Sequence, residues 1–393
     1  MEQLKKINFK DFIDKVSSYI EDTEQSELIK TAYNYILEYY GDKQKDTGET
    51  YIDHSLDIAY ILTDISADYE TLCAGLLHEI LSLETIKKEE LKELFGDTIV
   101  SLVDGVTRIN KLNFDSAETT AQIATQRKIL VGLCNDVRVI FIKLADRLHN
   151  TRILWLFSEQ VQKEKAKETL DILIPIAHRL GMNLWKSELE ELCLRYLKPD
   201  VYFGIIEQLN QSKAERDKVV EEMQLSVSEL LNNNNIKHKI KGRAKSIYSI
   251  YKKLDKGKKF SDIYDLLALR VYVNTEQECY QVLGIIHSKY RPIPKRFKDY
   301  IAMPKTNMYQ SLHTTIVTNF GQIFEIQIRT VEMNRIAEYG IAAHWKYKEG
   351  ISSQSMSELD KKLGWIKEVM DVEGDLKDSL EFIDTLKMNV TTN

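Results

Sequence analysis

The sequence predicts two domains of different class, an all-helical domain followed by a domain that mixes helices with a β-sheet. Its 393 residues are enough for two or three domains. Up to about residue 200, apolar residues recur at helical spacing, as in the run 58–65, and strand-like alternation is scarce. Beyond that point, the runs 267–273 and 324–329 alternate apolar and other residues, which is typical of strands.

The composition is that of a soluble globular protein, with 43% hydrophobic and 29% charged residues. A net charge of -6 argues against general affinity for nucleic acid, so DNA is not an expected partner. The charge is uneven, however, because the segment 237–259 holds ten Lys and Arg residues and one acidic residue, Asp255. A local excess of this kind indicates a bounded anion site.

The cysteines and the N-terminus indicate a cytoplasmic protein. Cys73, Cys134, Cys193 and Cys279 form no CxxC pair, which is typical of buried thiols in a reducing compartment. The N-terminal sequence MEQLKKINFKDF is too polar for a signal peptide. No apolar run approaches membrane-spanning length, so we expect no membrane contact.

The expected elements follow in order along the chain. The helical half has short breaks at 41–48 and 113–116, and Pro199 marks its end. The second half is expected to contain, in order, helices within 201–232, a turn at 232–235, a strand and then a helix in 237–254, a strand ending at 273, a helix over 276–289, a basic loop, two strands, a helix over 337–349 and a final helix over 359–370.

Four positions in the helical half are candidate metal ligands: His54, the adjacent pair His78 and Glu79, and Asp146. The pair ends the apolar run 72–77, and Asp146 follows another apolar run. Histidine and carboxylate groups at the ends of buried helices suit a divalent transition metal. The spacing is too wide to be specific, and each residue taken alone is more often a satisfied polar group at a helix end.

The run from Arg291 to Thr330 carries the strongest functional pattern. A basic loop punctuated by prolines leads, through Tyr309 and His313, into a strand that carries Glu325. Cations, an aromatic ring and a carboxylate together suit a nucleoside polyphosphate. The plainer alternative, an amphipathic strand with a solvated polar face after a surface loop, stays open on the residues alone.

Three segments of the first half are GETYIDHS (48–55), LVDGVTRINKL (102–112) and IKLADRLHNTR (142–152). They closely resemble the hydrolase half of RelA/SpoT homologues, the bacterial stringent-response enzymes that make and degrade guanosine tetra- and pentaphosphate. The resemblance implies an HD-type, all-helical phosphohydrolase domain over 1–155. It also implies a metal, usually manganese, that activates water to remove the 3′-pyrophosphate. By this resemblance the metal ligands are His54, His78, Glu79 and Asp146, with Asn150 nearby.

The chain departs from this family pattern where the hydrolysis chemistry lies. Glu79 replaces an aspartate, and Ser82 and Leu83 occupy the positions of a Glu-Asp pair that works on the attacking water and the leaving group. Smaller departures are Lys45 for an arginine, Thr125 for an asparagine, and the neighbouring carboxylate Glu84, displaced by one position. Without the pair, the obvious general acid and base are missing. We therefore expect a folded domain with weak or no hydrolysis that binds metal or guanine nucleotide as a regulatory module.

The second half resembles the synthetase domain of the same family through KGRAKSIYSIYKK, DIYDLLALRV, RFKDYIAMPK, YQSLHTT, EIQIRT and GIAAHWKYK. The set, in this order, is highly specific. It implies a nucleotidyltransferase-like mixed sheet flanked by helices over 201–345, after bridging helices at 156–200 and before a helical tail at 346–393. The implied reaction transfers pyrophosphate from ATP to the 3′-hydroxyl of GDP or GTP, forms pppGpp or ppGpp and releases AMP.

The resemblance also implies site residues. Asp265 would hold magnesium, and Glu325 would share the metal or accept the proton of the 3′-hydroxyl. The implied ATP-binding residues are Arg243, Lys245, Ser249 and Arg270. The implied guanosine nucleotide-binding residues are Arg296, Lys298, Lys305, Asn307, Tyr309, which would stack on guanine, and His313. For Lys252 and the basic residues after it we keep the interpretation of a solvated helix face and turn, and for His313 a core histidine is the alternative.

Two features of the basic loop bear on activity. Arg296-Phe297-Lys298-Asp299 is the basic version of a motif found in the bifunctional branch of the family. Lys295 and Met308 stand where the family often has glycine, which adopts left-handed backbone conformations without strain, so we expect a loop of different shape.

Three hypotheses follow from the sequence. The first is an active synthetase with a weak or inactive hydrolase domain, the second a bifunctional synthetase and manganese-dependent hydrolase in which Glu79 and Glu84 suffice, and the third a non-catalytic nucleotide-sensing module. Regulatory domains normally follow in this family, whereas this chain ends at Asn393. We therefore expect a truncated piece or a short natural form without ribosome contact.

Overall fold

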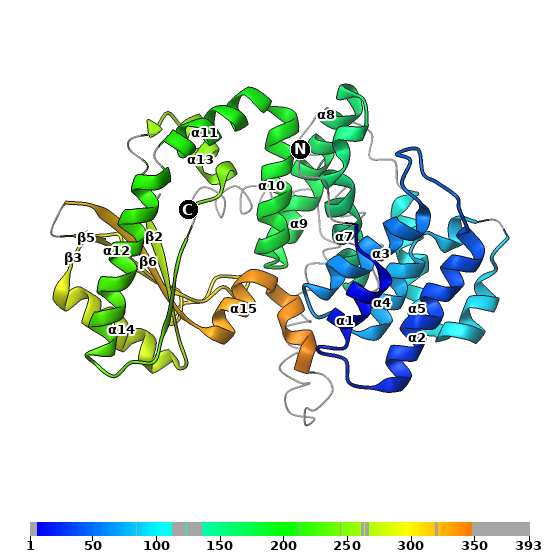
Figure 1. Cartoon of the computed structure of the whole chain (residues 1–393), viewed down its shortest axis with the longest axis horizontal. Coiled ribbons are helices and arrows are strands. Elements are labelled where there is room, and N and C mark those ends of the chain that lie inside the picture. Colours follow the sequence, from blue (N-terminus) through cyan, green and yellow to red (C-terminus); the bar gives the residue numbers. More distant parts are fainter. Residues whose placement is uncertain are drawn as a thin grey trace, which may run out of the picture. The chain divides into compact units, whose positions relative to one another are not determined.

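The computed structural model (Figure 1) describes residues 6–83, 85–111, 123, 136–211, 213–243, 245–260, 263, 267–318 and 321–347. The described residues up to Ile176, together with those from Ala342, form one compact unit, and Ala177–Ile341 form a second. The expected bridging segment, 156–200, is thus divided between the two units. Of the expected tail, only the first two residues are described, so the helix expected over 359–370 lies outside the described residues.

The described residues of the first unit form mostly helices, as the periodicity predicts. Its helices are α1 (Phe9–Val16), α2 (Thr23–Tyr40), α3 (Tyr51–Thr63), α4 (Tyr69–Leu77), η1 (Ile80–Ser82), α5 (Lys88–Asn110), α7 (Arg138–Arg152), η2 (Leu154–Leu156), α8 (Glu159–Glu168), η3 (Thr169–Leu173) and the start of α9 (Ile174–Arg179). The expected break at 41–48 is a turn closed by a β-bridge between Gln44 and Thr50, whereas the expected break at 113–116 lies outside the described residues. Asp22, Thr50 and Asp68 cap α2, α3 and α4 by accepting hydrogen bonds from first-turn amides.

Two glycines let the helices of this unit approach closely. A Cβ atom on Gly75 of α4 would lie 2.6 Å from Leu62 Cδ1 of α3, and one on Gly105 of α5 would lie 2.8 Å from Val139 Cγ2 of α7. The interface between α3 and α4 is therefore built around a missing side chain. This close packing brings the polar ends of these helices together.

The second unit contains α10 (Asn183–Leu197), α11 (Pro199–Gln211), α12 (Lys213–Asn232), β1 (Lys239–Gly242), α13 (Ile247–Asp255), β2 (Ala268–Val273), α14 (Glu276–Lys289), β3 (Arg291–Pro292), β4 (Lys298–Asp299), β5 (Leu312–Val317), β6 (Ile323–Thr330), α15 (Val331–Tyr339) and η6 (Gly340–Tyr347), which continues past Ile341. The strand order is β1-β2-β6-β5-β3, and β4 pairs with β5. Among the strands of the described residues, β2 and β6 pair in parallel, while the other pairs are antiparallel. The mixed sheet flanked by helices is therefore confirmed.

The sheet buries one face against α12 and α14, which lie beside it in Figure 1. Phe324, Ile326 and Ile328 of β6 point into this core and are fully buried. The alternation of β6 then turns Glu325, Gln327 and Arg329 to the opposite face. That face is not solvated, because Gln327 is only 3% exposed and Arg329 only 1%. The alternative of a solvated polar face is therefore wrong for these two residues.

The helix expected over 337–349 is wrong in its boundaries. Thr330 caps α15, which begins at Val331 and ends at Tyr339, and Gly340, with φ 59°, follows as the C-cap. A Cβ atom on Gly340 would lie 2.0 Å from the carbonyl oxygen of Leu180, so the close approach of these two backbones requires glycine. From Gly340 to Tyr347 the chain continues as a 3₁₀-helix instead.

The basic loop contains the two expected non-glycine departures, but its backbone keeps the conformation that glycine favours. Lys295 has φ 64° and Met308 has φ 63°, so both residues are left-handed. We expected a loop of different shape because residues other than glycine tend to avoid this conformation. At Lys295 and Met308 this expectation is wrong.

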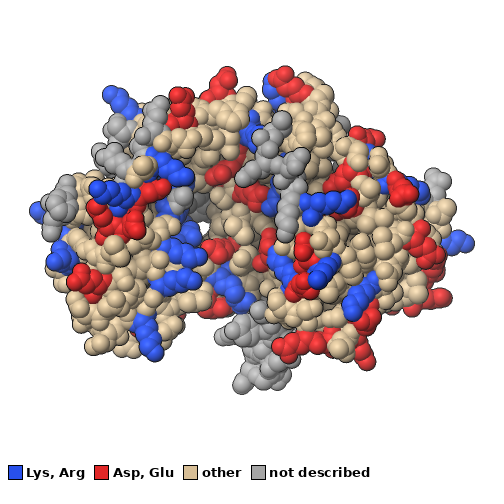
Figure 2. All heavy atoms as spheres, viewed as in Figure 1, with Lys and Arg blue, Asp and Glu red and all other residues tan. Residues whose placement is uncertain are grey.

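No described helix has the length and apolarity needed to cross a membrane. On the face drawn in Figure 2, basic and acidic side chains are interspersed.

Candidate functional sites

Three of the four predicted metal ligands of the helical unit lie together. His54 comes from α3, His78 from the end of α4 and Asp146 from α7, and one ligand atom of each lies within 4.8 Å of the others. All three side chains are buried. His54 Nε2 lies 3.6 Å from Asp146 Oδ1. Residues far apart in sequence thus form one compact set of nitrogen and oxygen donors, which we call the HD cluster.

The histidines of the HD cluster are oriented as metal ligands. His78 Nδ1 lies 2.8 Å from the carbonyl oxygen of Gly75, and His54 Nδ1 lies 3.3 Å from Glu49 Oε2. These contacts set Nδ1 as the donor in each ring, and both Nε2 atoms are buried without a hydrogen-bond partner among the described residues. Unpartnered ring nitrogens facing a carboxylate fit a divalent metal ion.

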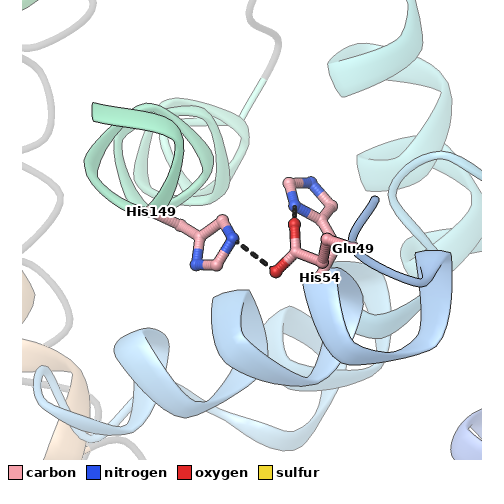
Figure 3. A group of neighbouring side chains, drawn as sticks. All are labelled: Glu49, His54 and His149. Atoms are coloured by element: carbon pink, nitrogen blue, oxygen red, sulfur yellow. Dashed lines mark hydrogen bonds and ion pairs between the residues drawn. The ribbon is translucent and has the colours of Figure 1, made fainter. Parts of the chain in front are cut away.

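Figure 3 shows Glu49 between His54 and a second histidine, His149. The two carboxylate oxygens of Glu49 point to different histidines, Oε2 to His54 and Oε1 to Nε2 of His149 at 2.9 Å. His149 Nδ1 in turn lies 3.6 Å from Asp57 Oδ2. Although burial opposes it, hydrogen bonds from His149 and His54 lower the pKa of Glu49 to about 2. Glu49 is therefore an anion that fixes the orientation of His54.

Charges around the HD cluster keep His78 and Asp146 in the protonation states that a metal requires, whereas, although burial opposes this, hydrogen bonds with Asp146 and Glu49 raise the pKa of His54. Burial lowers the pKa of His78 to about 4, so its ring is neutral near pH 7. Burial opposes ionisation of Asp146, but Lys143, with Nζ 2.8 Å from Oδ2, and His54 hold the pKa of that carboxyl well below its usual range. Asn150, predicted to lie nearby, donates a 2.6 Å hydrogen bond to Asp146 Oδ1.

Glu79, the fourth predicted ligand, contacts a lysine. Lys45 Nζ lies 3.0 Å and 2.9 Å from the two carboxylate oxygens of Glu79. The predicted replacements Ser82 and Leu83 lie in and just after the short helix η1, and Ser82 is exposed. Glu84 and Thr125 lie outside the described residues.

The polar face of the sheet in the second unit gathers the predicted synthetase residues around Glu325. Arg243 Nη1 and His313 Nδ1 each lie 3.5 Å from Glu325 Oε1. Gln327 Nε2 donates a 2.8 Å hydrogen bond to the same atom. Burial opposes ionisation, but the contacts with His313 and Arg243 hold the pKa of Glu325 far below its ordinary value. Glu325 is therefore a firmly ionised carboxylate.

His313 links Glu325 to the aromatic part of the face. Its Nε2 lies 2.7 Å from the hydroxyl of Tyr309, and its ring packs edge-on against Tyr300. Lys305 Nζ lies 4.7 Å from the centre of the Tyr300 ring and 5.3 Å from that of Tyr309. An aromatic ring, a histidine and a lysine thus lie side by side. Because His313 joins this polar network, the alternative of a plain core histidine is not supported.

Two arginines meet beyond Glu325 on the same face. Arg270 Nε and Arg329 Nη2 each lie 3.4 Å from Gln327 Oε1, and Arg270 Nη1 lies 3.5 Å from Glu338 Oε1. Burial lowers the pKa of Arg329, whose Nε has no hydrogen-bond partner among the described residues. Gln327, Arg329 and Glu338 were not among the predicted site residues, although the period-two pattern of β6 already places the first two beside Glu325.

Most of the remaining predicted residues of this half are also among the described residues. Ser249 sits in the first turn of α13, where its amide and hydroxyl contact the Ser246 side chain. Lys298 pairs with His313 in the β4–β5 register. Asn307 Oδ1 accepts a hydrogen bond from the amide of Tyr309. Arg296 is exposed, and Lys245 is half-buried. Asp265 lies outside the described residues.

Comparison with known proteins assigns both halves. Residues 32–183 match a family model described as an HD domain, and residues 242–352 match one described as a region found in RelA/SpoT proteins. A GTP pyrophosphokinase of Myxococcus xanthus is 42% identical over 96% of this chain and 50% of its own length. A guanosine-3′,5′-bis(diphosphate) 3′-pyrophosphohydrolase of Aquifex aeolicus is 39% identical over 99% of this chain and 55% of its own length.

A probable guanosine-3′,5′-bis(diphosphate) 3′-pyrophosphohydrolase of Synechocystis is 41% identical over 92% of this chain and 48% of its own length. The chain spans about half the length of these curated relatives. Both matched regions occur here in the same order as the helical unit and the mixed-sheet unit, and the similarity runs through nearly all of the chain. The chain therefore belongs to the RelA/SpoT homologue family.

Proposed function

We propose that this chain is a guanosine polyphosphate synthetase, which transfers pyrophosphate from ATP to the 3′-hydroxyl of GDP or GTP and releases AMP. The observation that carries this proposal is the polar face of the sheet, where Glu325 is surrounded by Arg243, His313 and Gln327. Its chemistry, cations and an aromatic ring around a buried carboxylate, suits two nucleotides whose phosphate groups must be brought together.

In the proposed reaction the 3′-hydroxyl oxygen attacks the β-phosphorus of ATP and forms a new P–O bond. The bond between the α–β bridging oxygen and the β-phosphorus breaks, AMP leaves, and the hydroxyl proton passes to solvent. Tyr309 stacks on the guanine, and His313 and Lys305 orient the acceptor. Arg243, Lys245 and Arg270 hold the ATP phosphates, because a guanidinium fork grips two oxygens. Magnesium, held by Asp265 and Glu325, would neutralise phosphate charge when bound.

The environment of Glu325 bears on its role. A carboxylate whose pKa is held far below the ordinary value by His313 and Arg243 is a weak base. Phosphoryl transfer through a loose transition state needs more positioning than proton abstraction. Of the two predicted roles, we therefore favour orienting the hydroxyl and sharing the magnesium over acting as a strong general base.

A direct assay tests the proposal. The protein is incubated with magnesium, labelled ATP and either GDP or GTP, and AMP and guanosine polyphosphate are separated by chromatography. We expect equal amounts of both products and a loss of at least about 100-fold for Glu325→Gln, in line with the removal of a charged active-site group. Tight nucleotide binding without AMP formation would favour the non-catalytic sensor instead.

For the helical unit we propose a divalent metal site at the HD cluster, with manganese as the expected ion and weak or absent hydrolysis. When bound, such a metal would activate water. The residues that would manage the proton and the leaving group are missing at Ser82 and Leu83. His54, His78 and Asp146 would hold the metal.

The bifunctional enzyme is the second candidate, and the intact donor set of the HD cluster favours it. Incubation with guanosine tetraphosphate and manganese separates the two. No GDP above a metal-free control would support the weak hydrolase, whereas clear release of GDP and pyrophosphate, abolished in His78→Ala, would establish the bifunctional enzyme.

A further inference from the structure

Two lysines from different helices of the second unit share one buried carboxylate. Nζ of Lys186, on α10, lies 3.2 Å from Glu190 Oε1, and Nζ of Lys252, on α13, lies 3.9 Å from the same oxygen. The Glu190 side chain is only 6% exposed, while those of Lys186 and Lys252 are 21% and 37% exposed. Lys252 is therefore not part of a fully solvated helix face, and Lys186 was not among the predicted site residues.

Several basic side chains surround this carboxylate. Burial, together with the charges of Lys186, Lys305 and Lys252, lowers the pKa of His178 to about 4. Burial and the charges of Lys298 and Lys186 lower the pKa of Lys305 to about 8. Lysines that lower the pKa of neighbouring basic groups in a half-buried position indicate a local positive potential.

The same place is joined to the basic loop. The side-chain amide of Asn307 donates a long, 3.5 Å hydrogen bond to the carbonyl oxygen of His178. His178 Nδ1 is buried and has no hydrogen-bond partner among the described residues. The loop that carries Lys305 and Tyr309 is thus packed on the segment that leads into α10, so Lys186 and the predicted acceptor residues belong to one region of the second unit.

We propose that Lys186, Lys252 and Lys305 form a binding site for the phosphate chain of a nucleoside di- or triphosphate. The proposal rests on the proposed synthetase function and adds α10 to its binding machinery. Three ammonium groups from a helix, a second helix and a loop can contact successive phosphates of a flexible chain, since lysine acts as a mobile point charge. Glu190 holds two of these cations in place and limits their mutual repulsion until the anion arrives.

The phosphate chain can come from ATP or from the guanosine nucleotide, and steady-state kinetics distinguishes the two. Each nucleotide is varied at saturating concentration of the other for Lys186→Ala, Lys252→Ala and the control Lys258→Ala, which removes an exposed lysine just beyond α13. We expect both site variants to raise KM about tenfold for the same one nucleotide, since a charged hydrogen bond is lost. Lys186→Arg should restore most of the affinity.

A KM for both nucleotides within twofold of wild type in Lys186→Ala and Lys252→Ala would overturn the proposal. An equal rise in Lys258→Ala would do the same, because it would show only an effect of general charge. Far-ultraviolet circular dichroism and the unfolding midpoint show that each variant is folded.

A second measurement does not depend on catalysis. If the wild-type protein makes no product, the proposed function fails, and calorimetry with inorganic tripolyphosphate then tests the anion site alone. Lys186→Ala/Lys252→Ala should bind tripolyphosphate at least about tenfold more weakly than Lys258→Ala. Glu190→Gln should bind it more tightly than wild type, because it removes a competing anion. If the lysines serve only an internal ion pair, neither change in affinity will occur, and the proposal is then wrong.

Discussion

Nε2 of His313 lies 2.7 Å from the hydroxyl of Tyr309, while Nδ1 of the same ring lies 3.5 Å from Glu325 Oε1. One imidazole thus connects the ring proposed to stack on guanine with the carboxylate proposed to lie at the reacting centre. In the register of the sheet, His313 is opposite Gln327, one of the groups that also contacts Glu325. The positions of Tyr309 and Glu325 are therefore physically coupled, and the proposed function would couple acceptor binding to the position of Glu325.

The two functions of Tyr309 can be separated by substitution. Tyr309→Phe keeps the ring and removes the hydroxyl, so we expect the KM for GDP or GTP to rise by no more than about tenfold, the worth of one hydrogen bond. Tyr309→Ala also removes the stacking surface and should raise that KM further. The KM for ATP should stay within twofold in both variants. A larger rise of this KM in Tyr309→Phe than in Tyr309→Ala would contradict the stacking role.

Lys305 predicts a pH dependence of acceptor use. Burial and neighbouring lysines lower the pKa of Lys305 to about 8 in the free protein, so its ammonium is charged below that pH and neutral above it. Because kcat/KM reports ionisations of the free enzyme, kcat/KM for the guanosine nucleotide should fall as pH rises through about 8. Lys305→Arg keeps its charge and should remove this step. An unchanged profile in that variant would assign the step to another group.

Local patterns predicted much of the second unit. The helix expected over 276–289 has these bounds in the structure. Its start is set by a capping box between Thr275 and Glu278, a pattern that spans only four residues of sequence. The two faces of β6 follow from period-two alternation alone. The start of α15 at Val331 was missed, because its cap, Thr330, is also the last residue of a strand.

The sites depend on contacts that no local pattern encodes. His54, His78 and Asp146 are brought together by the packing of three helices. The residues alone offered them as candidate metal ligands at a spacing too wide to be specific, and the family resemblance implied the same set. His149 was missed because it is nearly 100 residues away from Glu49 and His54 in sequence. Glu49, five residues before His54, was missed as well. Lys186 and Lys252 meet at Glu190 only through the packing of α10 on α13.

The left-handed residues of the basic loop predict a gain in stability on substitution by glycine. Lys295→Gly and Met308→Gly should each raise the free energy of unfolding of this unit by about 0.5–1 kcal/mol, because relief of left-handed strain exceeds the entropy that glycine adds to the unfolded chain. Denaturant titration followed by tyrosine fluorescence measures the change. Arg296→Gly, next to Lys295 but without positive φ, is the control and should destabilise.

Glu49 predicts a loss of metal affinity without loss of a ligand. Glu49→Ala removes the acceptor that orients His54 and should weaken manganese binding about 10–100-fold, the usual effect of removing a carboxylate behind a metal-ligating histidine. Glu49→Gln should retain more manganese affinity than Glu49→Ala, because the amide oxygen of glutamine can still accept a hydrogen bond from His54 Nδ1. His149 would then change tautomer, so that its Nδ1 donates to Asp57. Electron paramagnetic resonance of free manganese measures both. Equal affinity in wild type and Glu49→Ala would exclude this role.

The pairing of Lys45 with Glu79 predicts the opposite effect on the same metal. Lys45 contacts both carboxylate oxygens of Glu79, so a metal must compete with an ammonium group for this ligand. Lys45→Met removes the competitor and a positive charge from beside the HD cluster, and we expect manganese affinity to rise about tenfold, the equivalent of one favourable charge contact. Lys43→Met removes a nearby exposed lysine and should leave the affinity unchanged. In Lys45→Met/Glu79→Gln the gain should shrink, because Glu79 can no longer supply a charged oxygen. If the double variant keeps the full gain in manganese affinity, Lys45 acts on the metal through its charge alone, and Glu79 does not become a ligand.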